Sequence, residues 1–174
     1  MKRLRIEFKI FILFIIAAAV VLMSGIAAGK GKLLVMQNNT TGQKIEFYLP
    51  ERQFSLGYMH SVMKTPAEEF FRINKNNEIV LEKTVYESFG VGLPFLADGN
   101  DFEIEDGKFI LKTNYILKEI NMIISPIPEH WLRIGDMKYE IMDILKVKNS
   151  SITIYASNIS IIRYLSMLFN NQYS

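Results

Sequence analysis

Cysteine is absent from the 174 residues, and there are only two histidines and one tryptophan. The lack of cysteine excludes disulfides, zinc–thiolate sites, cysteine nucleophiles and lipid attachment through a thiol. The two histidines do not form the H-E-x-x-H spacing of a zinc helix. Stability must therefore come from packing and hydrogen bonds, and no metal or other cofactor is predicted.

A basic cluster is missing from most of the chain, although the formal net charge is +2 and the pI is about 8.7. Four of the basic residues precede Ile10, against the single acid Glu7, so the remainder of the chain is near neutral. Binding of nucleic acid depends on Lys and Arg that neutralise phosphates. No nucleic-acid partner is expected.

One long apolar stretch runs from Ile10 to Gly29 without a charge. As a helix, these twenty residues would span about 30 Å, the thickness of a hydrocarbon core. The basic residues before it favour a cytoplasmic N-terminus. The sequence thus predicts a cytoplasmic tail (1–9), a transmembrane anchor (10–29) and an extracytoplasmic domain (30–174), in a single-pass protein of the cell membrane.

A cleaved signal peptide is the alternative for the same segment. Small residues at 25–29 have a spacing compatible with cleavage. The apolar part of a signal peptide is typically about 7–15 residues long, however, and this stretch is longer. Its length favours a retained anchor, whereas cleavage would give a secreted protein.

Beyond residue 30 the dominant hydrophobic period is two, which is typical of β-strands. Turn signals such as Asp106-Gly107 separate segments rich in β-branched and aromatic residues. Nine segments have this pattern: 32–37, 44–49, 54–60, 69–73, 79–88, 108–113, 119–124, 138–145 and 151–156. The pattern predicts an all-β fold, an antiparallel β-sandwich or partly open barrel of about nine or ten strands.

The last segment, 158–169, has apolar residues at helical spacing behind a possible cap at Ser157 or Asn158. It predicts a short helix that packs on the sandwich. A final strand is the alternative, because short apolar runs are ambiguous between the two.

A candidate site lies around the first histidine. Alternation places Tyr58 and His60 on the apolar face of one strand and Glu69 on the same face of the next. If the two strands pair, His60 and Glu69 meet near the hairpin end. The pair then has three interpretations: a structural pair, a ligand contact, or a catalytic base with its orienting or metal-binding partner. Ser61 projects to the opposite face, so a Ser–His relay between neighbours has poor geometry.

A second stretch, F-G-V-G-L-P-F at 89–95, follows the predicted strand that carries Tyr86. Its two glycines allow a ligand or another strand to approach closely, although a β-bulge and turn is the favoured explanation. His130 is interpreted as a loop residue at the start of a strand. The candidate ligand contacts are Tyr58, His60, Ser61, Glu69, Tyr86, Gly90 and Gly92.

Five short motifs, taken in order, resemble a known bacterial family, the one catalogued as domain of unknown function (DUF) eighteen-fifty. They are Y-x-H-S-V at 58–62, E-x-F-x-I at 69–73, S-F-G-V-G-L-P at 88–94, D-G at 106–107 and H-W-L-x-x-G at 130–135. The resemblance covers most of the span from Leu33 to Ile144. Val91 stands where alanine is expected, a small departure.

The resemblance implies a small exported or membrane-anchored bacterial protein, often encoded beside TRAP transporters of the TAXI class, which import small and often anionic solutes. It therefore implies an accessory role in uptake, through contact with a transporter component or its solute, and it implies no reaction. A small exported hydrolase that uses His60 and Glu69 is the alternative function.

Overall fold

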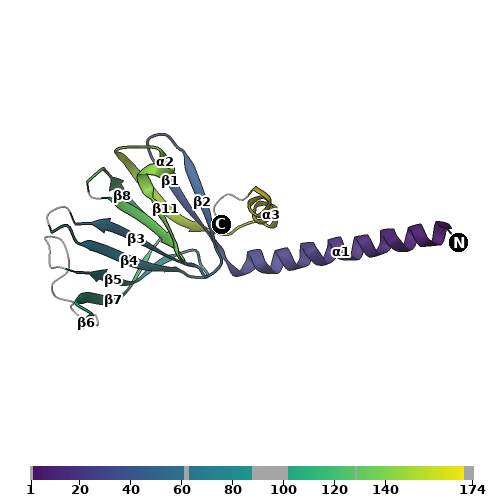
Figure 1. Ribbon diagram of the computed structural model, residues 1–174, viewed down its shortest axis with the longest axis horizontal. Coiled ribbons are helices and arrows are strands. Elements are labelled where there is room, and N and C mark those ends of the chain that lie inside the picture. Colours follow the sequence, from purple (N-terminus) through teal and green to yellow (C-terminus); the bar gives the residue numbers. More distant parts are fainter. Residues whose placement is uncertain (1, 61–62, 88–101, 128, 171–174) are drawn as a thin grey trace.

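The computed structural model describes residues 2–60, 63–87, 102–127 and 129–170; in its helices, the side chains at 2–8, 24, 26–28, 168 and 170 lie outside the description. A long N-terminal helix, α1 (Lys2–Lys30), leads into two antiparallel sheets with two short helices (Figure 1). The predicted all-β domain is thus confirmed, and its sheets remain open rather than closing into a barrel.

The smaller sheet has four strands in the order β2-β1-β11-β8. Every neighbouring pair is antiparallel. Its strands are β1 (Lys32–Asn38), β2 (Lys44–Leu49), β8 (Glu119–Ile124) and β11 (Ser150–Ser157). β1, one of the two inner strands, is buried along almost its whole length.

The larger sheet has seven strands in the order β10-β9-β3-β4-β5-β7-β6. These are β3 (Gln53–Met59), β4 (Pro66–Ile73), β5 (Ile79–Tyr86), β6 (Phe102–Glu105), β7 (Lys108–Leu117), β9 (His130–Ile134) and β10 (Met137–Glu140). The predicted turn at Asp106-Gly107 joins β6 to β7, and both residues have positive φ, as a two-residue hairpin turn requires.

The hydrophobic core lies between the inner faces of the two sheets. Leu34 and Met36 of β1 and Ile152 of β11 come from the smaller sheet, and Leu56 and Phe71 come from the larger one. Alternate residues of each strand point inward, so the period-two pattern becomes one continuous apolar layer.

Two strands were not predicted, and one predicted strand is partly wrong. The segment 138–145 splits into β10 and the helix α2 (Ile141–Leu145), whose two end residues are fully buried. Ile141 and Leu145 are four residues apart, so one helical turn places both side chains on the same face, and that face packs into the core. Lys146 in the left-handed region then ends the helix. The strands missing from the nine predicted segments are β6 and β9, although a strand start was expected at His130.

The C-terminal helix, α3 (Ile161–Asn170), confirms the helical interpretation of 158–169. Its cap is neither Ser157 nor Asn158: the hydroxyl of Ser160 accepts a hydrogen bond from the backbone N–H of Arg163 at 3.2 Å. Within the described part of the chain, no helix is both long enough and apolar enough to cross a membrane.

Polar contacts join α1 to the sandwich. The Arg52 guanidinium donates to the carbonyl oxygen of Lys30 at 2.5 Å, one of the backbone acceptors that a helix C-terminus leaves without a partner. Just beyond, the buried Lys32 donates from Nζ to the Lys75 carbonyl and to the side-chain oxygens of Asn77 and Asn158, at 3.1, 2.5 and 2.6 Å. Lys32 therefore ties β1 to the β4–β5 turn of the other sheet.

Candidate functional site

Three polar side chains share the inner face of the larger sheet on neighbouring strands. In the β3–β4 ladder, Leu56 pairs with Glu69, and in the β3–β9 ladder, Tyr58 pairs with His130. Paired residues point to the same side of a sheet, so Tyr58, Glu69 and His130 (the cavity residues) all face the smaller sheet. The long-range pairing of β3, β4 and β9 is what positions them.

A cavity of about 360 Å³ lies in front of these residues. Strand β8 of the smaller sheet forms the opposite wall with Ile120, Asn121 and Met122, and Leu56 contributes from β3. The walls are mainly apolar, and the cavity residues add a few polar groups. This composition is typical of pockets for small molecules, although the volume is at the small end of their range.

The carboxyl of Glu69 has no hydrogen-bond partner within the described residues, and the side chain is half-buried. Burial raises the pKa of Glu69 above its ordinary value of 4.5, because the charged form loses water. Burial also raises the pKa of Tyr58, and the nearby Glu69 charge raises it further. Ionisation of either group therefore opposes ionisation of the other.

Histidine 130 adds an imidazole to the same cavity. Burial lowers the pKa of His130, with the backbone at Ser125 acting in the opposite direction, so the neutral ring is favoured. Its Nδ1 atom is buried and has no hydrogen-bond partner among the described residues. The ring centroids of His130 and Tyr58 lie 6.4 Å apart. A buried polar atom without a partner is uncommon in folded proteins, and this atom has almost no surface open to the cavity that the rest of His130 lines.

The predicted meeting of His60 and Glu69 is wrong. Glu69 pairs with Leu56, so His60 lies four residues further along, about 13 Å away at the rise of a strand. β3 ends at Met59, and His60 begins the turn into β4. Its Nδ1 accepts a hydrogen bond from the backbone N–H of Met63 at 3.1 Å, which is a role in the turn. The predicted strand segments 54–60 and 69–73 left a loop of 61–68, whereas β4 already begins at Pro66. This earlier start changes the pairing register of β3 and β4.

The remaining predicted contacts divide into two groups. Tyr86 shares the inner face but is fully buried, in a separate cluster with Ala67 and Leu111 beside the cavity. Ser61, Gly90 and Gly92 lie outside the described residues.

His130 is the cavity residue that sequence reasoning missed. The alternation of His130 and Leu132 on one side with Trp131 and Arg133 on the other was the available signal. The prolines before it favoured a loop. The fact that decides its role, pairing with Tyr58 on a strand far away in the sequence, is not local.

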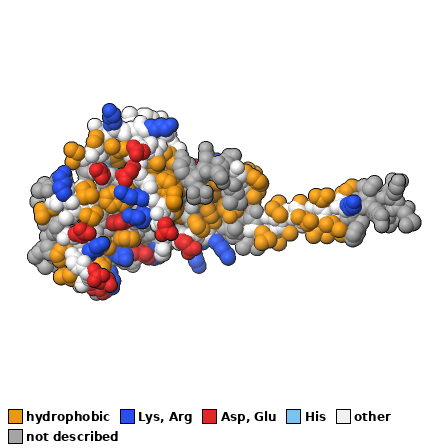
Figure 2. Space-filling view, in the orientation of Figure 1, with side chains coloured by type: hydrophobic (Ala, Val, Ile, Leu, Met, Phe, Trp, Pro, Cys, Tyr) orange, Lys and Arg blue, Asp and Glu red, His pale blue; other side chains and the backbone are white. Residues whose placement is uncertain are grey.

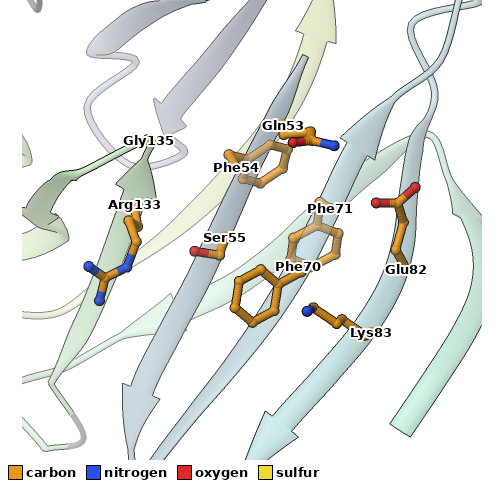
Figure 3. Close-up of a pocket in the computed structure, with 9 residues that line it drawn as sticks. All are labelled: Gln53, Phe54, Ser55, Phe70, Phe71, Glu82, Lys83, Arg133 and Gly135. Atoms are coloured by element: carbon orange, nitrogen blue, oxygen red, sulfur yellow. The ribbon is translucent and has the colours of Figure 1, made fainter. Parts of the chain in front are cut away.

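A second hollow, of about 340 Å³, lies on the outer face of the larger sheet (Figure 3). Its polar side chains already have partners. The Oε1 atom of Glu68 accepts a hydrogen bond from Arg133 at 2.9 Å and another from the Ser55 hydroxyl at 2.5 Å. The ammonium of Lys83 lies 4.7 Å from the centre of the Phe70 ring. These groups satisfy one another and leave little for a ligand, so the inter-sheet cavity is the stronger candidate.

Within the described residues, no three His, Asp or Glu side chains gather where they would hold a metal ion. The site therefore combines one acid, one imidazole and one phenol without a cluster of ligands. Such a set can exchange hydrogen bonds with a small molecule, since Tyr58 and His130 each donate or accept and an ionised Glu69 accepts.

The fold is that of an antiparallel two-sheet β-sandwich domain with a polar-lined cavity between its sheets. The chain belongs to the family described as Domain of unknown function (DUF1850), whose model matches residues 54–141, half of the chain. This match is narrower than the resemblance predicted, but it contains every residue that lines the cavity. Among curated proteins and among solved structures, the comparisons find no match.

Proposed function

We propose that this protein is a non-catalytic binding domain, held at the outer surface of the cell membrane by α1, that takes a small molecule into the cavity between its sheets. The observation that carries the proposal is the half-buried Glu69 carboxyl, which has no hydrogen-bond partner among the described residues and lines a cavity together with Tyr58 and His130. Partial burial of a carboxyl without a partner costs free energy, and a bound ligand that donates a hydrogen bond to Glu69 recovers part of that cost.

The chemistry of the cavity limits the ligand. Leu56, Ile120 and Met122 favour a compact apolar body. The Glu69 carboxylate favours an amino or hydroxyl group as hydrogen-bond donor and repels a carboxylate. The ligand class is therefore a small apolar molecule with one donor group.

The membrane anchor is supported by the surface of α1. Between Ile10 and Met23, the large apolar side chains are all at least 40% exposed, and Phe14 reaches 72%. Figure 2 shows hydrophobic side chains along this helix, whereas the domain carries charges of both signs. Exposed apolar surface of this extent is costly in water and stable in lipid.

We further propose an accessory role beside a TRAP transporter of the TAXI class, as the resemblance to this family implies. Such a role requires contact with a transporter component, with its solute, or with both. The acid in the cavity disfavours an anionic solute, so contact with a transporter component is the form that we propose. The His60–Glu69 hydrolase has no geometric support, because the strand register separates the two side chains.

Binding is tested by ligand-observed NMR on the full-length protein in detergent, with cyclohexylamine, cyclohexanol and cyclohexanecarboxylate as probes. We expect the amine and the alcohol to bind and the carboxylate not to bind. Glu69→Gln should weaken the amine most, and His130→Phe should weaken both. Ser55→Ala, on the outer face of β3 between the strands of His130 and Glu69, is the matched control. Equal signals from all three probes, unchanged in the variants, would refute the cavity as the site.

Anchoring and partnership are tested in the bacterial host. Full-length protein should fractionate with membranes and be accessible to protease only from outside, and a tagged copy should retain a TRAP permease. Soluble protein that begins near residue 28 or 30 would show a cleaved signal peptide instead. Recovery of the membrane fraction without any permease would refute the transporter role and leave the anchor intact.

A further inference from the structure

The C-terminal helix α3 is fixed to the outer face of the smaller sheet by two contacts. The Arg163 guanidinium donates two hydrogen bonds to Glu46 of β2, at 2.8 and 2.6 Å. The Tyr164 ring packs edge-on against Tyr48 of the same strand, with centroids 4.9 Å apart. Tyr48 in turn lies over Gly31, where a Cβ would overlap its ring. The helix therefore has a defined position next to the end of α1.

The opposite side of α3 is apolar and uncovered. Ile162 is 82% exposed and Phe169 is 85% exposed. They are seven residues apart, which puts them on one face of a helix. A free-standing domain in water gains nothing from two large apolar side chains held side by side in this way.

The position of this face relative to α1 indicates what covers it. Ile161, at the start of α3, contacts α1 at Gly25: a Cβ there would lie 3.3 Å from the end of the isoleucine side chain. Figure 1 shows α3 on the side of the domain from which α1 projects, and nearly end-on while α1 lies across the view. Among the described side chains of α1, the exposed apolar ones run as far as Met23, two residues before the contact of Gly25 with α3.

We propose that α3 is an interfacial helix that lies on the lipid surface which α1 enters, with Ile162 and Phe169 inserted among the lipid chains. The inference rests on the proposed anchoring by α1. Short amphipathic helices with large apolar side chains on one face occupy this boundary, where their polar face stays in the headgroup layer. A single helix lets a domain swivel, whereas a second lipid contact beside it holds the domain in one orientation. α3 would thereby orient the cavity relative to the membrane.

The test uses full-length protein reconstituted into vesicles of phosphatidylcholine with brominated acyl chains, which quench indole fluorescence only by close approach. Ile162→Trp and Phe169→Trp each place an indole on the apolar face of α3. Ile123→Trp is the matched control, because Ile123 is 75% exposed on β8, an edge strand of the sandwich. The buried Trp131 is common to all samples and is subtracted as the wild-type signal.

We expect the two α3 indoles to be quenched by at least half relative to unbrominated vesicles, and the indole at position 123 to be unaffected. Protein that floats with the vesicles but shows no quenching from α3 would overturn the interfacial helix and leave the anchor in place. That result would assign the apolar face to a protein partner. Protein that does not float would overturn both the anchor and the inference. Equal quenching at all three positions would mean that the domain has no fixed orientation, which also contradicts the proposal.

Discussion

The indole of Trp131 lies directly over Gly57 on the neighbouring strand, and the two residues pair across β9 and β3. A Cβ at position 57 would overlap the ring, so the site accepts only glycine while the indole stays in place. On the other side, the ammonium of Lys138 lies 4.4 Å from the ring centre. These contacts hold Trp131, the chain neighbour of His130, in place on β9.

Gly57→Ala is expected to destabilise the protein by about 1–3 kcal/mol, because the added methyl forces the indole or the strand to move. Urea unfolding followed by far-UV circular dichroism measures this loss. The same substitution in a Trp131→Ala background should cost much less, because the overlapping ring is gone. An equal cost in both backgrounds would show that the overlap is not its cause.

Glu69→Gln should change the dependence of stability on pH. Burial raises the pKa of Glu69 in the folded protein above its ordinary value of 4.5, so the folded state binds this proton more tightly than the unfolded state does. The resulting stabilisation is complete below the unfolded pKa and disappears as pH rises through the folded pKa. The wild type therefore loses this stabilisation from about pH 4.5 upward, whereas Glu69→Gln does not. The melting temperature of the variant should rise relative to that of the wild type over this pH range.

The measurement is a series of thermal melts between acidic and neutral pH. Glu105→Gln, which removes an exposed acid from β6 of the same sheet, is the control. Profiles of wild type and Glu69→Gln that run parallel would mean that Glu69 is not effectively desolvated, and would weaken the case for the cavity.

Lys32→Ala should destabilise the sandwich by about 1–3 kcal/mol, because the oxygens of Asn77 and Asn158 lose their buried donor. Lys44→Ala on the neighbouring strand is the control, since Lys44 is exposed and its ammonium contacts the Tyr155 side chain. Its effect should stay within about 0.5 kcal/mol. Chemical unfolding of both variants decides the question, and equal small losses would show that the Lys32 contacts contribute no net stability.

Ser160→Ala should loosen α3 without affecting the core. Removing an N-cap costs about 1 kcal/mol, equivalent to roughly a fivefold rise in local opening. Hydrogen exchange should therefore speed up by about fivefold in α3 while β1 and β11 keep their protection. Ser166→Ala, inside the same helix, should not accelerate exchange. Faster exchange throughout the domain would show that α3 is part of the cooperative unit rather than an attached helix.

Sequence reasoning located most of the strands because their signal is local. The segment 44–49 matches β2 in both of its bounds, and Asp106-Gly107 forms the expected hairpin. The strands β6 and β9 were missed, since one has only four residues and the other follows prolines. In the candidate site, the shared face of Tyr58 and Glu69 followed from alternation alone. The supposed partner of Glu69 did not.

The pattern of residues along the chain was enough to establish the all-β domain, the long apolar N-terminal stretch and the side of each strand on which a residue lies, because alternation is a property of the extended backbone. Only the tertiary structure decided which side chains meet. The β3–β4 register places Leu56, and not His60, opposite Glu69, and the β3–β9 pairing brings His130 next to Tyr58. Register depends on the length of each turn and on which distant strands bury their faces together, and neither is encoded in the pattern of a single strand.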